Sequence, residues 1–71
     1  MPFLDINCKS LNDFLTVQFE LEIHGYNFKE NEEESMLYLY VDSEEVADTI
    51  IEELEDFLSV EVEFYYDETD Y

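Results

Sequence analysis

The sequence predicts a small α+β domain: a two-layer sandwich with an antiparallel or mixed β-sheet and one or two helices packed on one face. The chain has 71 residues, which is enough for one domain around a single modest core. Apolar residues make up 46% and aromatic residues 17%, so the chain can bury a core despite its acidity. Segments with strand periodicity flank one with helical periodicity. We expect one domain over residues 1–71, with residues 67–71 loose.

The N-terminal part begins with "FLDINC", residues 3–8, which is typical of a short strand. Residues 10–25 fit two different structures. Ser10 with Asp13 resembles a capping box, and Gly25 stands where a helix would end, so these residues favour a helix. A strand is favoured by five apolar residues that alternate strictly with polar ones, namely Leu15, Val17, Phe19, Leu21 and Ile23. Both interpretations stay open at this point.

An amphipathic helix is predicted from about Ser43 to Leu58. Asp42 or Ser43 can cap its start. Its apolar residues fall at the spacings of one stripe, namely Val46, Ala47, Ile50, Ile51, Leu54, Phe57 and Leu58. Acidic residues cover the rest of the surface, and those of the first turn suit the positive end of the helix dipole. Glu55 and Asp56, near the other end, do not.

Two strands flank this helix. In "SMLYLYV", residues 35–41, one face has Leu37, Leu39 and Val41, and the other has Met36, Tyr38 and Tyr40. In "SVEVEFYY", residues 59–66, an apolar face alternates with Glu61 and Glu63. A strand, a helix and a strand of these lengths can form a right-handed crossover unit. The preceding segment "NFKENEEES", residues 27–35, is expected to be a polar connection.

The net charge limits the partners of the chain. It is −19, from 21 acidic residues and two lysines. Self-repulsion of this size opposes compaction, which suggests that the charge itself has a use. Nucleic acid and anionic membranes would be repelled, whereas a basic cleft that normally holds nucleic acid would attract the chain. We therefore expect the partner to be a basic DNA-binding protein or enzyme.

The residues that usually perform chemistry are scarce. Cys8 cannot form an internal disulfide, which fits a reducing cytoplasm and a buried role. His24 has no nucleophile near it in the sequence. No calcium-loop spacing, phosphate-binding glycine loop, leader or membrane-spanning run occurs. The sequence therefore predicts a cytoplasmic protein that is not an enzyme, with no catalytic residue, no cofactor and no metal.

The spacing of the carboxylates suggests an imitation of phosphate. Helix residues four apart are about 6 Å apart along the axis, and strand residues two apart are about 6.7 Å apart. One strand of duplex DNA has a phosphate per about 3.4 Å of axis, and the backbone path between phosphates is longer. Two sets of residues could each imitate a short row of phosphates, namely Glu44, Asp48, Glu52 and Asp56 on the helix and Glu61 with Glu63 on the strand. The alternative is a solvated acidic face.

A second candidate surface is the tyrosine face of the strand at residues 35–41. If the leucines face the helix, Met36, Tyr38 and Tyr40 lie on the opposite face of the sheet. Either the segment at residues 10–25 packs beneath them, or they form an exposed apolar patch rimmed by acids. Such patches mark interaction sites.

Four segments resemble the phage uracil-DNA glycosylase inhibitor family, whose small acidic members imitate DNA. They are "SLNDFL", "ESMLYL", "EEVADTI" and "VEFYYDETD", in the order of that family, and the resemblance covers roughly residues 10–70. It implies that Glu34 and Ser35 lie where DNA phosphates would contact the enzyme. It also implies that Glu45 and Asp48 flank a pocket for the enzyme's DNA-probing loop, with walls from Met36, Leu37, Tyr38 and Val46. The expected partner-binding residues are these eight with Tyr40, Glu52, Glu61 and Glu63.

Three functions remain open from the sequence. The first is a DNA-mimic inhibitor, with uracil-DNA glycosylase as the expected target. The second is the same mimicry against a CRISPR effector or a restriction enzyme, whose DNA channels are also basic. The third is a ferredoxin-like or ACT-like regulatory or assembly domain, since strand–helix–strand–strand–helix–strand can be fitted to the chain. Either a monomer or a homodimer is expected.

Overall fold

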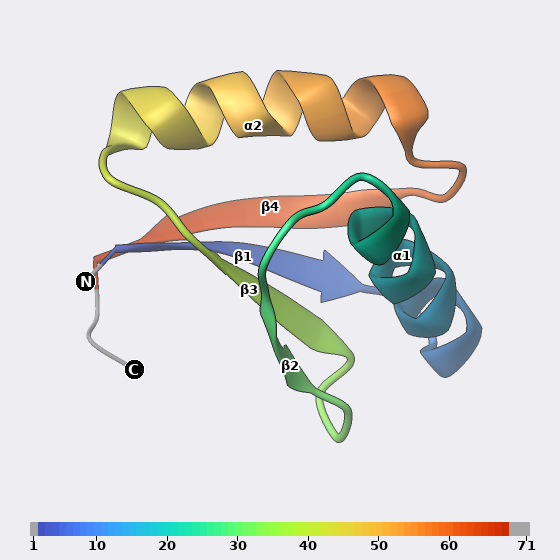
Figure 1. The fold of residues 1–71 in the computed structure, drawn as a ribbon. Coiled ribbons are helices and arrows are strands. Elements are labelled where there is room, and N and C mark those ends of the chain that lie inside the picture. Colours follow the sequence, from blue (N-terminus) through green and yellow to red (C-terminus); the bar gives the residue numbers. More distant parts are fainter. Residues whose placement is uncertain (1, 69–71) are drawn as a thin grey trace.

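The described residues form four strands and two helices in the order βαββαβ (Figure 1). A computed structural model describes residues 2–68. The elements are β1 (Phe3–Cys8), α1 (Leu11–Ile23), β2 (Lys29–Asn31), β3 (Met36–Tyr40), α2 (Glu44–Phe57) and β4 (Val62–Asp67). The strands form one sheet in the order β2-β3-β1-β4, and all neighbours are antiparallel. This confirms the predicted α+β class.

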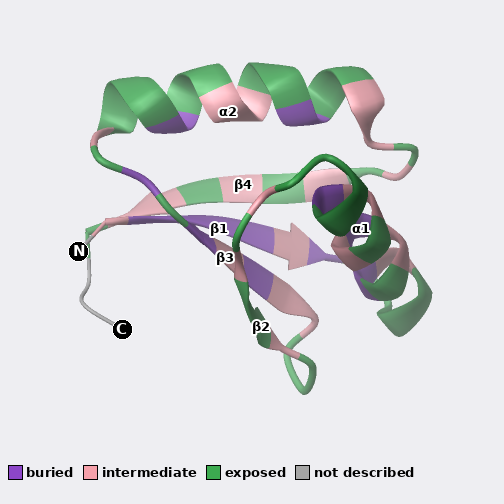
Figure 2. Ribbon diagram, in the orientation of Figure 1, coloured by how far each residue is buried: buried purple, intermediate pink, exposed green. Residues whose placement is uncertain are grey.

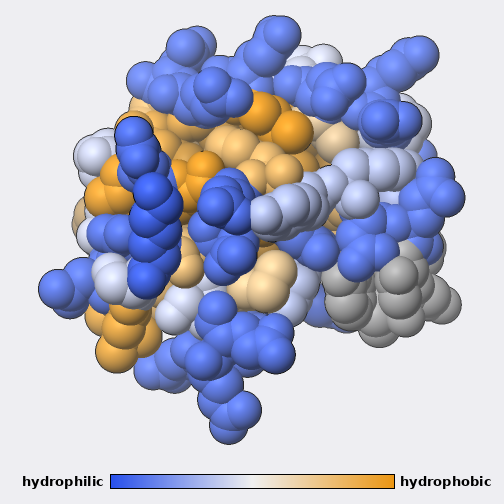
Figure 3. Space-filling model, turned by 180° about the vertical axis from the view of Figure 1, so that it is seen from behind, coloured by the Kyte–Doolittle hydropathy of each residue, from blue (hydrophilic) through white to orange (hydrophobic). Residues whose placement is uncertain are grey.

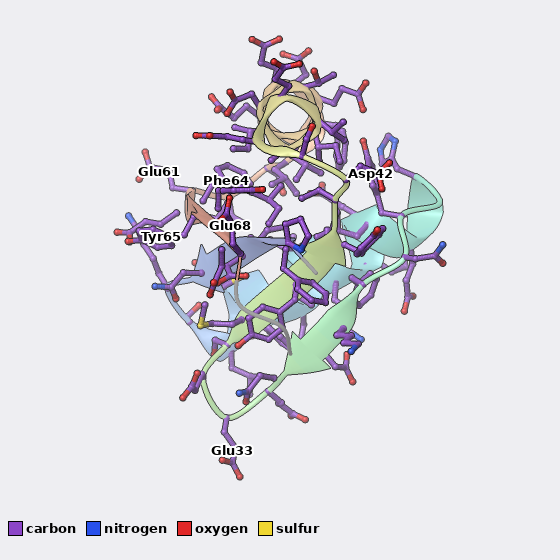
Figure 4. The ribbon with its side chains drawn as sticks, turned by 90° about the vertical axis from the view of Figure 1, so that its left-hand side faces the viewer. Glu33, Asp42, Glu61, Phe64, Tyr65 and Glu68 are labelled. Atoms are coloured by element: carbon purple, nitrogen blue, oxygen red, sulfur yellow. The ribbon has the colours of Figure 1, made fainter. Side chains whose placement is uncertain are left out.

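The sheet order explains how the strand–helix–strand unit closes. Strands β3 and β4 both pair with β1, on its two sides, so they run in the same direction with β1 between them. Helix α2 crosses from one to the other. This is the split βαβ arrangement of ferredoxin-like folds. Both helices contribute to one core with the sheet, and Figures 1 and 4 show them on the same side of it.

Helix α1 settles the ambiguity of residues 10–25 in favour of a helix. The Ser10 hydroxyl accepts a hydrogen bond from the backbone N–H of Asp13 at 3.1 Å. At the other end Gly25 has a φ of 80°, a conformation in which other residues are strained. The N–H groups of Gly25 and Tyr26 bond the carbonyls of Glu22 and Leu21, which is a Schellman motif.

The strand-like alternation in this segment has a physical cause. Helix α1 is apolar on two sides instead of one. Phe14, Val17 and Leu21 are buried against the sheet. A second set of four large apolar residues is exposed to solvent, namely Leu11, Leu15, Phe19 and Ile23. Members of the two sets fall at alternate positions from Leu15 to Ile23, so a helix with two apolar sides resembles a strand in the sequence.

Helix α2 forms as predicted, within one residue at each end. Ser43 is its N-cap, and its hydroxyl accepts a hydrogen bond from the N–H of Val46 at 3.3 Å. Ala47 and Leu54 are fully buried under the helix. Figure 2 shows buried and partly buried residues on the sheet side of α2 and exposed residues outside. Val46 was predicted in the buried stripe, but it is 38% exposed because it lies at the margin of that stripe.

The segment at residues 27–35 is more ordered than predicted. It contains β2, which pairs with β3 in a hairpin, and residues 32–35 form the turn. Ser35 has a φ of 55° in this turn, so β3 begins at Met36 and not at Ser35. Strand β4 likewise begins at Val62 and not at Ser59. Asp67, predicted to be loose, ends β4, and residues 69–71 lie outside the described part.

The core lies between the sheet and the two helices. Its fully buried members include Leu4 and Ile6 of β1, Leu37 of β3, Phe14 of α1 and Leu54 of α2. Cys8 belongs to this core, and burial raises the pKa of its thiol to about 11, with a smaller contribution from Asp13. Neither helix has the length and apolar character required to cross a membrane, judged over residues 2–68.

Candidate partner-binding surface

The outer side of α2 is the most acidic surface of the described chain. Seven carboxylates of this helix are exposed, namely Glu44, Glu45, Asp48, Glu52, Glu53, Glu55 and Asp56. The helix has no lysine or arginine. Figure 4, which looks along the helix axis, shows these side chains fanning outward from α2. We call this set the acidic face. The predicted partner-binding residues Glu45, Asp48 and Glu52 all belong to it.

A groove separates the C-terminal end of α2 from the edge strand β4. Its volume is about 610 Å³. Apolar side chains line it from the α2–β4 connection and from β4 itself, namely Leu58, Val60, Val62 and Phe64. Charged groups surround them, namely Lys9, Glu55, Glu61 and Glu63. Figure 4 shows Phe64 between α2 and the sheet, with Glu61 pointing outward.

The carboxylates at the start of β4, Glu61 just before the strand and Glu63 within it, have hydrogen-bond partners within the molecule. Lys9 Nζ lies 3.1 Å from Glu61 Oε2, with both side chains largely exposed. An exposed pair of this kind contributes little to stability because water and salt screen it. The Tyr65 hydroxyl donates a hydrogen bond to Glu63, and this bond raises the pKa of Tyr65. Glu61 and Glu63 both border the groove. The negative charge is less concentrated here than on the acidic face.

The tyrosine face lies on the open side of the sheet. Met36, Tyr38 and Tyr40 point away from the helices, and α1 packs on the other side, so α1 does not cover them. Tyr40 is 49% exposed, while Met36 and Tyr38 are half-buried. A hydrogen bond to Asp42 raises the pKa of Tyr40, and burial raises that of Tyr38. The segment at residues 10–25 does not pack beneath this face, and the predicted exposed patch is confirmed for Tyr40 but only in part for Met36 and Tyr38.

A small apolar hollow of about 310 Å³ opens beside these tyrosines. The Phe3 ring meets the Tyr40 ring edge-on at a centroid distance of 6.3 Å. Lys29 Nζ lies 5.5 Å from the centroid of the Phe3 ring, close enough for a cation–π contact. The open face thus already accommodates one cation against an aromatic ring.

The residues implied by the family resemblance do not meet at one place. Glu34 and Ser35 lie in the β2–β3 turn, where the Ser35 carbonyl accepts a hydrogen bond from Cys8 N–H at 2.9 Å. Figure 1 shows this turn and α2 at opposite ends of the molecule. Leu37 is fully buried in the core, and Val46 is on α2. Met36, Leu37, Tyr38 and Val46 therefore do not line a common pocket.

Sequence reasoning missed most residues of the groove and the hollow. Val60, Val62 and Phe64 belong to the apolar face predicted for residues 59–66, but the groove that they line beside α2 depends on tertiary packing, which the sequence does not show. Phe3 and Lys29 come from segments read only as a short strand and a connection. The alternation of "FLDINC" was the available signal for Phe3, because it places that residue opposite Leu4.

The arrangement can bind but offers little chemistry. Over residues 2–68, no three His, Cys, Asp or Glu side chains gather as they would around a metal ion. The His24 ring stacks on Phe57 at a centroid distance of 3.8 Å, which gives it a packing contact between the two helical regions. What the described surface offers is carboxylates, exposed aromatic rings and a groove lined by both apolar and charged side chains. Comparison with protein-family models, curated proteins and solved structures finds no match for this chain.

Proposed function

We propose that this protein is a non-enzymatic inhibitor that occupies the nucleic-acid cleft of a basic enzyme by imitating DNA. The observation behind the proposal is the acidic face: seven exposed carboxylates on one helix without a single cation. A face kept only for solubility needs no such segregation, because interspersed charges of both signs also keep proteins soluble. Such a concentration of one sign suits a basic partner.

The charge density of α2 supports the comparison with DNA. A helix of 14 residues is about 21 Å long. Seven carboxylates over this length correspond to one charge per about 3 Å, close to the one phosphate per about 3.4 Å of a single DNA strand. The rigid helix holds these charges in place before binding, so the partner does not have to order them.

The proposed mechanism has two parts. The acidic face accelerates association because it attracts the basic cleft over a distance of about a Debye length, about 8 Å in physiological salt. Apolar and aromatic contacts then slow dissociation. Two surfaces are available for them: the groove between α2 and β4, which has carboxylates on its rim, and the tyrosine face.

We propose uracil-DNA glycosylase as the first target to test, in the cytoplasm of a phage-infected host. The family resemblance supports this choice, and so does a groove beside a helix in which apolar side chains lie among carboxylates such as Glu55 and Glu61. Glu34 lies in the β2–β3 turn, far from α2. We therefore expect the target to contact the acidic face and the groove and not this turn. A CRISPR effector or a restriction enzyme fits the same surface and is the next target to assay.

The test is a uracil-excision assay with purified glycosylase, titrated with this protein at low and physiological salt. We expect inhibition that saturates near one-to-one and weakens with salt. Two triple variants then separate local mimicry from bulk charge. Glu45→Gln/Asp48→Asn/Glu52→Gln acts on the acidic face, and Glu30→Gln/Glu32→Gln/Glu33→Gln acts on exposed carboxylates of the β2–β3 hairpin.

Both variants remove three charges, so bulk charge predicts equal losses of inhibition. Local mimicry predicts that the first variant loses at least about tenfold in inhibition, which corresponds to about 1.4 kcal/mol. The second variant should lose less. No inhibition at large excess over the glycosylase, the CRISPR effector and the restriction enzyme alike would end the proposal. Inhibition of one of the latter two would keep the mimicry and change the target.

The topology favours a second candidate function. The order βαββαβ with a β2-β3-β1-β4 sheet is ferredoxin-like, and a regulatory or assembly domain would use this fold for a ligand or an oligomer interface. Such a role does not require the seven carboxylates of α2. The two triple variants therefore also separate these candidates, because an assembly domain would keep its activity in both.

A further inference from the structure

The exposed side of α1 carries an apolar stripe that neither the fold nor the proposed function uses. Leu11, Leu15, Phe19 and Ile23 follow one another at intervals of four residues, and their exposed fractions are 49%, 51%, 63% and 63%. Four large side chains in one row make a contiguous apolar patch, and contiguous patches, unlike scattered single residues, often have a function. We call this row the α1 stripe.

The charge around the α1 stripe differs from that of the acidic face. Helix α1 has three acidic residues, and two of them, Asp13 and Glu20, are half-buried. Glu20 Oε2 also accepts a hydrogen bond from the N–H of Ser59 at 3.4 Å. Glu22 is thus the one fully exposed carboxylate of α1, against seven on α2. Two copies that meet at the α1 stripe therefore repel each other less than two copies that meet at the acidic face.

Figure 3 shows how apolar and charged residues are distributed on one face of the molecule. Hydrophobic surface lies at the left of this view, on the side of α1, and also in the upper centre beneath α2, while hydrophilic side chains project at the top, where α2 lies. A basic partner would be drawn to the acidic face. The α1 stripe offers such a partner almost no charge to recognise, so a second copy of this chain matches it better.

We propose that the protein forms a symmetric homodimer through the α1 stripe. A row at intervals of four residues is a ridge of the kind that packs into the equivalent ridge of another helix, with a crossing angle of about −50°. In a two-fold arrangement each ridge faces its own copy, so one row suffices for both partners. Leu15 and Phe19, in the middle of the row, lie at the crossing point. The acidic faces stay outside the interface, available to basic partners.

The size of the patch sets the expected strength. A 13-residue helix is about 20 Å long and about 10 Å wide, which is small compared with the roughly 800 Å² per partner of a standard interface. The dimer is therefore expected to be weak and to depend on concentration. Salt strengthens it, because screening reduces the repulsion between two chains of −19 each. Binding of a basic target has the opposite salt dependence.

The experiment is sedimentation velocity of the full chain from about 5 μM to about 1 mM, the range in which a weak dimer dissociates. It is done at about 0.05 and about 0.5 M NaCl, where screening differs most. We expect the mass to rise from 8.6 kDa toward twice that value, and at lower protein concentration in the higher salt. The double variant Leu15→Gln/Phe19→Gln should stay at the mass of one chain.

Val46→Gln is the matched control, because it makes the same kind of change at an exposed apolar residue of α2. It should dimerise like the parent. A parent protein that remains monomeric at every protein and salt concentration overturns the proposal. The α1 stripe would then be a binding site for a different protein. A dimer that survives the double variant also overturns it, since the interface is then elsewhere. Circular dichroism verifies that each variant folds.

A second measurement does not depend on changing the stripe. A spin label at Glu22→Cys, beside the stripe, should give a short distance between copies, and one at Asp48→Cys on the acidic face a long one. The reverse order of distances would contradict the proposed interface. This inference does not rest on DNA mimicry, and its test needs no target enzyme. Failure of one proposal therefore leaves the other intact.

Discussion

At the scale of single residues, the clearest specific contact between distant parts of the chain joins Tyr26 to Glu53. The Tyr26 hydroxyl donates a hydrogen bond to Glu53 Oε2 at 2.6 Å and connects the end of α1 to α2. Burial, followed by this bond and the negative charge of Glu53, raises the pKa of Tyr26 to about 12. The contact is therefore a protonation-dependent link between the two helical regions.

We predict that Tyr26→Phe lowers the free energy of unfolding by about 1 kcal/mol at neutral pH, because it removes one hydrogen bond to a carboxylate. In the unfolded chain the pKa is about 10, so the folded chain holds this proton more tightly. The contribution is complete below pH about 10 and is lost as pH rises toward about 12. The difference between parent and variant should narrow over that range.

Urea unfolding of both proteins from pH about 7 to about 11 measures this difference, and the other tyrosines cancel because both chains share them. Glu53→Gln is the control: combined with Tyr26→Phe, it should cost less than the sum of the two single changes. A parent–variant difference that is constant with pH would show that the link does not depend on the tyrosine proton.

At the scale of elements, local signals decided which parts of the fold could be predicted. Helix α2 has one apolar side and a serine cap, and its position was predicted within one residue. Helix α1 was ambiguous because its second apolar side imitated strand alternation. Strand β2 is only Lys29–Asn31, with no periodicity to detect, and it exists because β3 pairs with it across a turn.

The site was less predictable than the fold for a related reason. A carboxylate on an amphipathic helix can be placed outside from the sequence alone, so Glu45, Asp48 and Glu52 were located correctly. The groove between α2 and β4 was not predictable, because it depends on how far α2 stands from the edge of the sheet. The family resemblance implied that Glu34 and the pocket residues lie together, but Glu34 lies in the β2–β3 turn, where Ser35 has a φ of 55° and the strand begins only at Met36.

Helix α2 also allows a test of whether its charge is kept at the expense of stability. Acids suit the N-terminal end of a helix and oppose its C-terminal end. We predict that Asp56→Lys raises the free energy of unfolding by about 0.5 kcal/mol, and that Glu44→Lys lowers it by a similar amount. Both replace a carboxylate by an ammonium group and take the net charge from −19 to −17, so bulk charge cannot explain opposite signs.

Chemical denaturation measures both variants, and the inhibition assay shows what the charge is for. If the acidic face binds the target, both variants should inhibit less well although only one is less stable. A stabilised Asp56→Lys that inhibits as well as the parent would mean that the end of α2 lies outside the contact. If Asp56→Lys instead destabilises the protein, the helix dipole does not determine how charge affects stability at the C-terminal end of α2.

At the scale of the whole molecule, the net charge of −19 opposes the fold that carries it. The chain has two lysines. Lys9 pairs with an exposed glutamate, and Lys29 lies over an aromatic ring. Neither reduces the charge of α2. Hydrophobic burial therefore has to outweigh a repulsion that extends over a molecule of 29 × 26 × 19 Å. At low salt these dimensions are less than a Debye length of about 30 Å, so every carboxylate interacts with every other.

We predict that NaCl stabilises the fold, in contrast to proteins held together by surface ion pairs. Between about 0.01 and 0.15 M the Debye length falls from about 30 to about 8 Å, and most repulsion across the molecule is screened in that interval. The melting temperature should rise by several degrees, since about 1 kcal/mol corresponds to about 4–8 °C in a domain of this size. Thermal unfolding monitored by circular dichroism measures the change, at a protein concentration low enough to keep the protein monomeric.

The triple variant Glu45→Gln/Asp48→Asn/Glu52→Gln is the control, because it lowers the net charge from −19 to −16. It should melt higher than the parent at low salt, and its melting temperature should depend less on NaCl. A parent whose melting temperature falls with salt would mean that attractive pairs outweigh the repulsion. A parent stabilised by salt, whose neutralised variant is more stable but inhibits poorly, would show that the charge is retained for binding.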